Sequence, residues 1–239
     1  MIGDSMTFDR TRCAGVGFAV ALMALAGGAA AQQAPYPTMA PREQYNSADE
    51  AALARSAAPA SISGDAEIMV LGARGYESVA KGKNGFVCLV ERSWANDLAS
   101  PEFWNPKVRS PICFNPASAR SVVPGYLKRT QWVLAGVAKP QIIERTKAAV
   151  AAHELGAPEA GAMAFMMSKE GYLGDDVGGH WRPHLMFFTP RTPAAAWGAG
   201  LPGVPLMGGD DGGLDPATVF FVPVDRWSDG APVPAPMKM

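Results

Sequence analysis

The chain has 239 residues, of which 48% are hydrophobic and 18% are charged, and its formal net charge is −1 at pH 7. A chain of this length can bury one sizeable hydrophobic core. Its near-neutral charge and its lack of basic runs argue against nucleic acid or an anionic lipid surface as the main partner.

The start of the chain has the three parts of a secretory signal peptide. Arg10 and Arg12 provide the basic segment, residues 14–25 form the apolar segment, and three alanines ending at Ala31 fit the cleavage rule. The apolar segment is too short for a stable membrane span, and no second run of spanning length follows. We therefore expect residues 1–31 to be removed. The mature protein is then exported, periplasmic or secreted, with no integral membrane span.

The mature chain begins with a lead-in and a group of short β-rich runs. Residues 32–58 are expected to form a flexible, Pro-rich lead-in and a short helix, with Ser47 as its N-cap. The β-rich runs cover residues 67–92, and the Asn84-Gly85 pair is a strong signal for a tight turn between antiparallel strands. This part of the sequence predicts a short antiparallel meander.

Two cysteines, Cys88 and Cys113, remain in the mature chain. An even pair in an oxidising compartment is most simply a disulfide. The two cysteines are 25 positions apart, so the chain-entropy model gives about 3–4 kcal/mol of stabilisation. We expect this bond to pin the aromatic loop over residues 93–117 onto the meander.

The rest of the sequence indicates helices followed by strands. We expect helix over residues 118–137, interrupted at Pro124-Gly125, a second helix over 140–155, strands over 162–168, 184–189 and 218–224, a helical turn over 194–200, and a loop over 208–213. Residues 59–227 should form a single α+β domain: an N-terminal meander, central helices and C-terminal antiparallel strands. Residues 228–239 are expected to be a disordered, Pro-rich tail.

Three blocks of the sequence together resemble a group of uncharacterised bacterial exported proteins. The blocks are KGKNGFVCLVER at 81–92, GAMAFMMSKEGYLG at 161–174 and HWRPHLMFFTP at 180–190. The resemblance covers most of the mature chain in scattered pieces. It implies export and a common fold for the three blocks, but it implies no activity and transfers no catalytic residue.

The stretch GGHWRPHLMFF holds two of the three histidines of the chain. If it is extended, His180, Arg182 and His184 share one face, because side chains alternate along a strand. Pro183 cannot donate to a strand ladder, so regular pairing is expected to begin near His184. The alignment of the two histidines thus depends on the backbone before the strand.

Three interpretations of these histidines stay open. A metal site would combine His180 and His184 with Asp175 or Asp176. An acid–base site would use the two histidines with Arg182 and Asp176. In the structural interpretation, which we favour, His184 hydrogen-bonds a carbonyl at the start of a buried strand. We accordingly expect no metal and no cofactor.

Four tryptophans are candidates for the lining of a ligand cleft, although core packing is the more common role of this residue: Trp94, Trp104, Trp181 and Trp197. The leading functional hypothesis is a non-enzymatic exported domain that binds a small molecule or acts as a structural or interaction module, so the partner is a small molecule or a protein. The alternative is a periplasmic hydrolase that uses His180 and His184, with or without a metal ion.

Overall fold

The computed structural model describes four stretches of the chain: residues 47–95, 100–175, 179–209 and 214–234. All four belong to one unit, residues 33–239. The expected signal peptide, residues 1–31, and the part of the expected lead-in over 32–46 lie outside the described residues.

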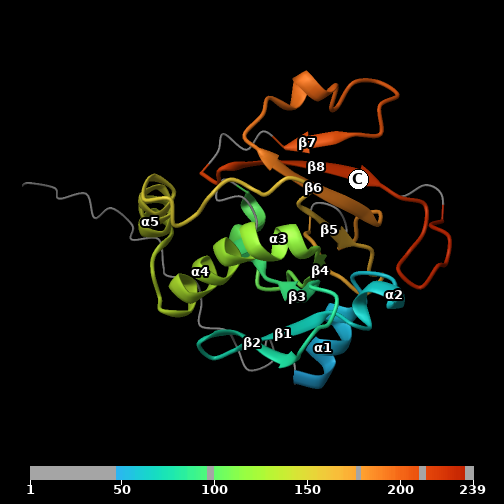
Figure 1. Cartoon of the computed structure of the whole chain (residues 1–239), viewed down its shortest axis with the longest axis horizontal. Helices are drawn as coiled ribbons and strands as arrows, with labels where there is room; N and C mark the ends of the chain where they lie inside the picture. The colour runs from blue at the N-terminus through green and yellow to red at the C-terminus, as the bar shows by residue number, and fades with distance from the viewer. Residues whose placement is uncertain (1–46, 96–99, 176–178, 210–213, 235–239) are drawn as a thin grey trace, which may run out of the picture. The chain divides into compact units, whose positions relative to one another are not determined.

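Eight strands form one mixed sheet in the order β2-β1-β3-β4-β5-β6-β8-β7 (Figure 1). Their bounds are β1 (Glu67–Gly72), β2 (Gly75–Ala80), β3 (Val87–Glu91), β4 (Ser110–Phe114), β5 (Met163–Met166), β6 (His184–Pro190), β7 (Met207–Gly209) and β8 (Ala217–Pro223). β1 and β3 run parallel, and every other neighbouring pair of these strands is antiparallel. The fold is α+β, in agreement with the prediction from sequence.

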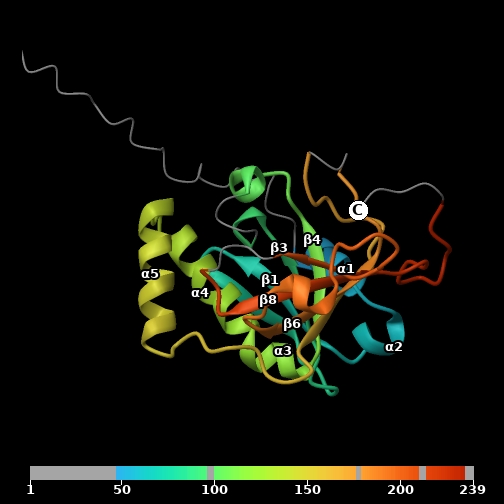
Figure 2. The same ribbon diagram turned by 90° about the horizontal axis from the view of Figure 1, so that it is seen from above.

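The helices cover the sheet unevenly. They are α1 (Ser47–Arg55), α2 (Ala60–Ser63), α3 (Pro116–Ser121), α4 (Val123–Leu134) and α5 (Lys139–Ala151), with 3-10 turns η2 (Ser93–Ala95), η3 (Pro101–Trp104) and η4 (Ala194–Trp197). α5 lies beside α4 (Figure 2). Within the described residues, no helix has the length and apolar composition needed to cross a membrane.

Helices pack on both faces of β3. Cys88 and Val90 pack in a cluster with Leu53 of α1. Leu89 packs in a second cluster with Val123 and other residues of α4. Successive side chains of a strand point to opposite faces, so α1 and α4 lie on opposite faces of the sheet (Figure 1).

Residues 67–92 do not form the expected meander. β1 and β2 pair as an antiparallel hairpin, but β3 lies on the other side of β1 and runs parallel to it. Between β2 and β3 the chain crosses the start of β1, where a Cβ at Gly82 would lie 2.3 Å from the Glu67 nitrogen, so glycine is required. Gly85 has a φ of 77°. The Asn84-Gly85 turn therefore forms, but it leads into this crossing instead of a hairpin.

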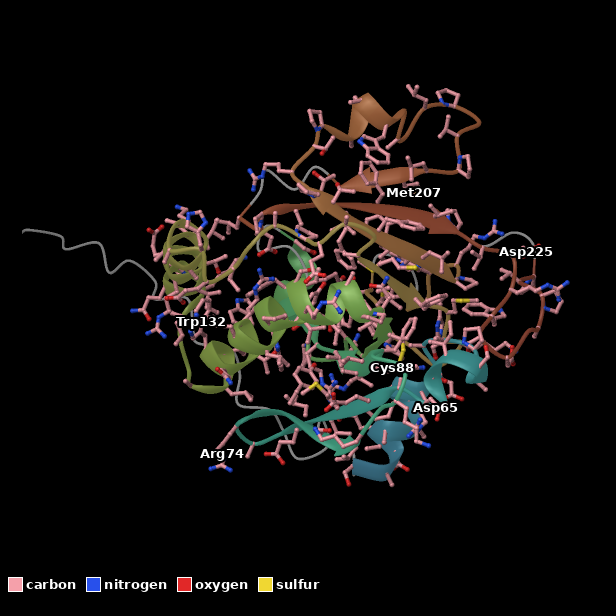
Figure 3. All side chains as sticks on the ribbon, viewed as in Figure 1. Asp65, Arg74, Cys88, Trp132, Met207 and Asp225 are labelled. Carbon is pink, nitrogen blue, oxygen red and sulfur yellow. A yellow bond between two sulfur atoms is a disulfide. The ribbon has the colours of Figure 1, made fainter. Side chains whose placement is uncertain are left out.

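The segment expected to be an aromatic loop contains a strand of the sheet. β4 pairs with β3, and Cys113 is the direct cross-strand partner of Cys88. The two cysteines form the predicted disulfide (Figure 3). Trp94 and Phe103 are buried in a cluster with Val133 of α4 and residues of α5. The disulfide thus joins two neighbouring strands, and the aromatic side chains owe their burial partly to the helices.

The later elements lie close to their predicted positions, with three differences, one of which is that β7 (Met207–Gly209) includes the start of the loop expected over 208–213. Pro124 stands in the first turn of α4, and the three predicted C-terminal strands form β5, β6 and β8. α5 ends at Ala151, short of the predicted Leu155. The described part of the tail, residues 228–234, is not detached, because the Ser228 N–H donates to the Met167 carbonyl at 2.9 Å.

A buried ion pair connects α1 to the end of β3. Arg92 Nη2 lies 2.8 Å from Glu50 Oε2, and each side chain is 1% exposed. Arg92 Nη1 also donates to the Val90 carbonyl at 2.6 Å, and Glu50 Oε1 accepts the Leu71 N–H at 3.0 Å. Each charge therefore has a second hydrogen-bond partner, as a buried ion pair requires.

Replacing Glu50 by alanine would leave the Arg92 guanidinium buried without a counter-charge. We expect Glu50→Ala to lower the free energy of unfolding by about 3–5 kcal/mol in urea denaturation. The matched control is Glu154→Ala, because Glu154 pairs with Lys128 on the surface and such pairs contribute about 0–1 kcal/mol. Equal losses in the two variants would contradict a structural role for the buried pair.

Candidate functional site

His184 is a buried residue at the start of β6, with 1% of its surface exposed. Its Nδ1 lies 2.8 Å from the Arg182 carbonyl oxygen, so the proton sits on Nδ1 and Nε2 is left as an acceptor. Nε2 is buried without a hydrogen-bond partner. Burial lowers the pKa of His184, and the hydrogen bond to Arg182 offsets part of this effect. The rings of Trp181 and Phe221 lie 5.7 Å from the imidazole.

The other residues of the predicted histidine site differ in their surroundings. His180 is exposed and Arg182 is half-buried, while Asp176 lies outside the described residues. Asp175 is exposed and accepts hydrogen bonds from a lysine and an asparagine side chain. Among the described residues, no three His, Cys, Asp or Glu side chains form a group that could hold a metal ion. The described part of the chain thus does not gather His180 and His184 into a metal site.

Of the four candidate tryptophans, Trp94 and Trp104 serve mainly in packing. Trp94 is buried and donates to a threonine of α4 at 2.9 Å. Trp104 packs at the edge of the same cluster. Trp181 is half-buried beside the ring of His184, and Trp197 is 54% exposed. None of the four lines the cavity beside α4 that is described next.

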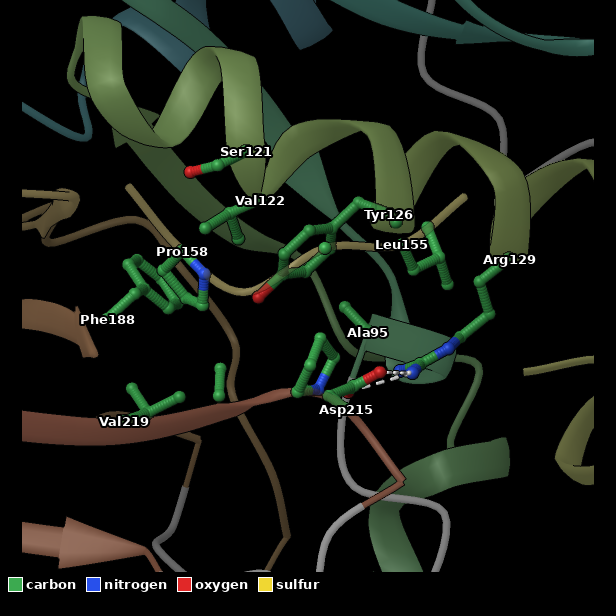
Figure 4. Close-up of a pocket in the computed structure, with 14 residues that line it drawn as sticks. Ala95, Ser121, Val122, Tyr126, Arg129, Leu155, Pro158, Phe188, Asp215 and Val219 are labelled. Carbon is green, nitrogen blue, oxygen red and sulfur yellow. Dashed lines mark hydrogen bonds and ion pairs between the residues drawn. The ribbon is translucent and has the colours of Figure 1, made fainter. Parts of the chain in front are cut away.

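A cavity of about 90 Å³ lies between α4, the segment that follows α5, and the start of β8 (Figure 4). Its walls are mainly apolar and include Val122, Leu155, Pro158, Phe188 and Val219. Among the described elements, α4 packs towards β2 and α3 packs on β4 and β5, whereas no helix packs extensively on β6 or β8. The cavity therefore occurs where the helical cover of the sheet ends.

The two charged side chains of the cavity lining are paired with each other. Arg129 Nη2 lies 2.8 and 2.9 Å from the two carboxylate oxygens of Asp215. The Arg129 side chain is 10% exposed and the Asp215 side chain is 44% exposed. A two-oxygen contact of this kind is the stronger form of an arginine–carboxylate pair. The lining consequently presents a neutral pair to the cavity.

Tyr126 is a polar residue of the cavity lining. Its ring extends from α4 towards the strand that carries Val219 (Figure 4). Burial, followed by the nearby Glu91 and Asp215 carboxyls, raises the pKa of Tyr126 well above its usual value. The phenol therefore stays neutral and can donate a hydrogen bond to a group in the cavity.

A buried carboxyl group lies against Tyr126. Glu91 is the last residue of β3, and its Oε1 is buried without a hydrogen-bond partner. Burial raises the pKa of Glu91 to about 8, and the interactions with Tyr126 and Arg129 offset part of this effect. Glu91 is therefore mainly protonated at pH 7. The cavity thus combines apolar walls with one neutral phenolic donor, and the Glu91 carboxyl lies outside its lining.

Sequence reasoning alone misses this cavity, although part of its signal is local. Tyr126 and Arg129 are three residues apart on one helix and so share a face. Glu91 directly follows the apolar residues of β3. This position in the sequence indicates a charged side chain at the end of a buried strand. Asp215 joins Arg129 across 86 positions of the chain, and no local pattern indicates this pairing.

Comparison of the chain with family models, curated proteins and solved structures finds no match.

The buried His184 should make the stability depend on pH. Folding lowers its pKa below the unfolded value of 6.5, so the unfolded state binds the proton more readily. His184 therefore does not lower the free energy of unfolding above about pH 6.5, and it lowers this free energy progressively as the pH falls below that value. Between pH 7 and pH 5 we expect the urea midpoint of the wild type to fall relative to that of His184→Gln, because only the wild type carries this titration. His180→Gln is the control, because His180 is exposed. A drop in His184→Gln equal to that of the wild type would contradict the assignment.

Glu91 should produce the opposite pH dependence. Its pKa is raised from 4.5 to about 8 in the folded state, so between these values the unfolded state has lost a proton that the folded state keeps. The difference in proton binding at Glu91 therefore lowers the free energy of unfolding as the pH rises, by at most about 1.4 kcal/mol per pH unit. Glu91→Gln stays neutral and should gain stability relative to the wild type between pH 5 and pH 8 in urea denaturation. Glu77→Gln, at an exposed position of β2, is the matched control. Parallel pH profiles for wild type and Glu91→Gln would disprove a buried neutral carboxyl.

Proposed function

We propose that the mature protein is an exported, non-enzymatic domain that binds a small molecule in the cavity beside α4. The cavity itself is the observation that carries this proposal, because mainly apolar walls with a few placed polar groups are typical of ligand sites. The walls come from α4, β6, β8 and the segment after α5. The polar groups are the Tyr126 hydroxyl and the Arg129–Asp215 pair.

The size of the cavity limits the group that it can hold. An engineered apolar cavity of about 150 Å³ binds benzene. The present cavity, at about 90 Å³, is smaller and is open on one side. It therefore suits a short alkyl group or a similar portion of a ligand, with the remainder extending towards solvent.

The lining favours binding over catalysis. Among the described lining residues, Ser121 carries the one aliphatic hydroxyl. That hydroxyl donates to the Ala117 carbonyl at 2.7 Å and accepts the Glu159 N–H at 3.0 Å. No histidine belongs to the described lining, so Ser121 has no histidine base within the cavity.

Export is supported by two features of the chain. The basic, apolar and small-residue segments of residues 1–31 have the order of a signal peptide. The Cys88–Cys113 disulfide is of the kind that persists in oxidising compartments. The resemblance to bacterial exported proteins agrees with both features.

A variant that fills the cavity tests the proposal. Gly125 lines the cavity, and a Cβ there would lie 3.8 Å from the Leu155 side chain, which is an ordinary contact distance. Gly125→Leu should therefore fold, and the helix should gain up to about 1 kcal/mol in propensity. With xenon as an apolar probe, we expect saturable shifts of the Tyr126 and Val219 amide signals in NMR spectra of the wild type, and their loss in Gly125→Leu.

Ala148→Leu is the matched control, because Ala148 is exposed on α5. It adds an aliphatic side chain to the surface and should leave the xenon shifts unchanged. Shifts that persist in Gly125→Leu, or a wild type without saturable shifts at these two positions, would refute an accessible cavity beside α4.

A further inference from the structure

We propose that the cavity beside α4 selects an uncharged ligand with a hydrogen-bond-accepting oxygen, which the Tyr126 hydroxyl binds. The chemical class is that of small ketones, esters and ethers with short aliphatic groups. This inference rests on the proposed function, because it assumes that the cavity is a ligand site.

The charges of the lining disfavour an ionic group inside the cavity. Arg129 and Asp215 satisfy each other through two contacts of 2.8 and 2.9 Å. A carboxylate ligand would have to displace Asp215 from Arg129, and an ammonium ligand would have to displace Arg129 from Asp215. Either exchange removes one charge-assisted contact for each one formed. A charged group that left this pair intact would instead lie desolvated against apolar walls.

Tyr126 offers the hydrogen-bonding group of the cavity. Glu91 interacts with Tyr126 from β3, but it is buried and does not belong to the cavity lining. Tyr126 belongs to the cavity lining, and its neutral phenol can donate its O–H to a group in the cavity. The ligand atom that matches it must be an acceptor.

The geometry also predicts how the ligand lies. The Tyr126 ring extends towards β8 (Figure 4), and the apolar walls on either side come from Val122, Phe188 and Val219. An acceptor oxygen at the phenol therefore leaves the aliphatic part of the ligand against these walls. Binding should depend both on the apolar contact and on one hydrogen bond, and the two contributions can be separated by isosteric probes.

Four probes of similar size separate these contributions: 2-butanone, its hydrocarbon isostere 2-methyl-1-butene, butyrate and butylammonium. Dissociation constants are measured at pH 7 from the Tyr126 and Val219 amide shifts of the full mature chain. We expect 2-butanone to bind about tenfold more tightly than either ion. We also expect it to bind about three- to tenfold more tightly than the hydrocarbon, which is the range for one net hydrogen bond.

Tyr126→Phe should weaken the binding of 2-butanone by the same three- to tenfold and leave that of 2-methyl-1-butene unchanged. The retained hydrocarbon binding shows that the variant is folded. The matched control is Tyr172→Phe, because the Tyr172 hydroxyl pairs with Asp175 and does not line this cavity. It should leave all four constants unchanged.

The outcomes distinguish this inference from the proposed function. Tighter binding of butyrate or butylammonium than of 2-butanone, at the same two amides, would overturn the neutral-ligand inference and leave the cavity as a ligand site. Equal effects of Tyr126→Phe on ketone and hydrocarbon would likewise overturn the role of the hydroxyl. If no probe, xenon included, shifts these amides, both the inference and the proposed function are wrong.

Discussion

The burial of β3 on both faces is the constraint on which the rest of the fold depends. The strand lies between β1 and β4 in the sheet, with α1 on one face and α4 on the other. Its residues alternate between the two helices, with Cys88 and Val90 towards α1 and Leu89 towards α4. A strand covered in this way has no solvated face, so polar side chains at its end also enter the interior. The sequence places two of them there, Glu91 and Arg92.

The alternation sends these two residues to opposite faces, and the fold accommodates them differently. Arg92 points towards α1, where Glu50 supplies a full counter-charge at 2.8 Å. Glu91 points towards α4, where Tyr126 and Arg129 offset only part of the effect of burial, and its pKa rises to about 8. A guanidinium cannot be neutralised by losing its proton, whereas a carboxyl can be neutralised by gaining one. The buried Arg92 is therefore stabilised by its ion pair with Glu50, whereas the buried Glu91 is stabilised by protonation.

Sequence patterns predict the elements of this fold better than their arrangement. Apolar runs and proline positions place the helices and the three C-terminal strands, because these signals are local. The parallel pairing of β1 and β3 was not predicted, since the Asn84-Gly85 turn is compatible with both a hairpin and a crossing. β4 was missed because prolines and aromatic residues surround a run of five residues that is buried on both faces. The histidine pair suggested a site because its spacing is local, but His184 begins the strand and is buried, while His180 precedes the strand and is exposed.

The cavity could not be predicted from local sequence patterns, because it lies where the helices cover the sheet incompletely. Phe188 and Val219 belong to the face that α3 and α4 cover, yet α4 packs towards β2 and α3 packs on β4 and β5, short of the strands that carry these two residues. Residues 155–158 meet the remaining area as irregular chain, and such a segment fills space less completely than a helix with its regular ridges. The same boundary explains the chemistry of the site. Tyr126 and Arg129 lie at the edge of the helical cover, where a polar end can reach the gap and an apolar body can stay in the core. A small neutral ligand would complete the packing at the point where the chain itself leaves it unfinished.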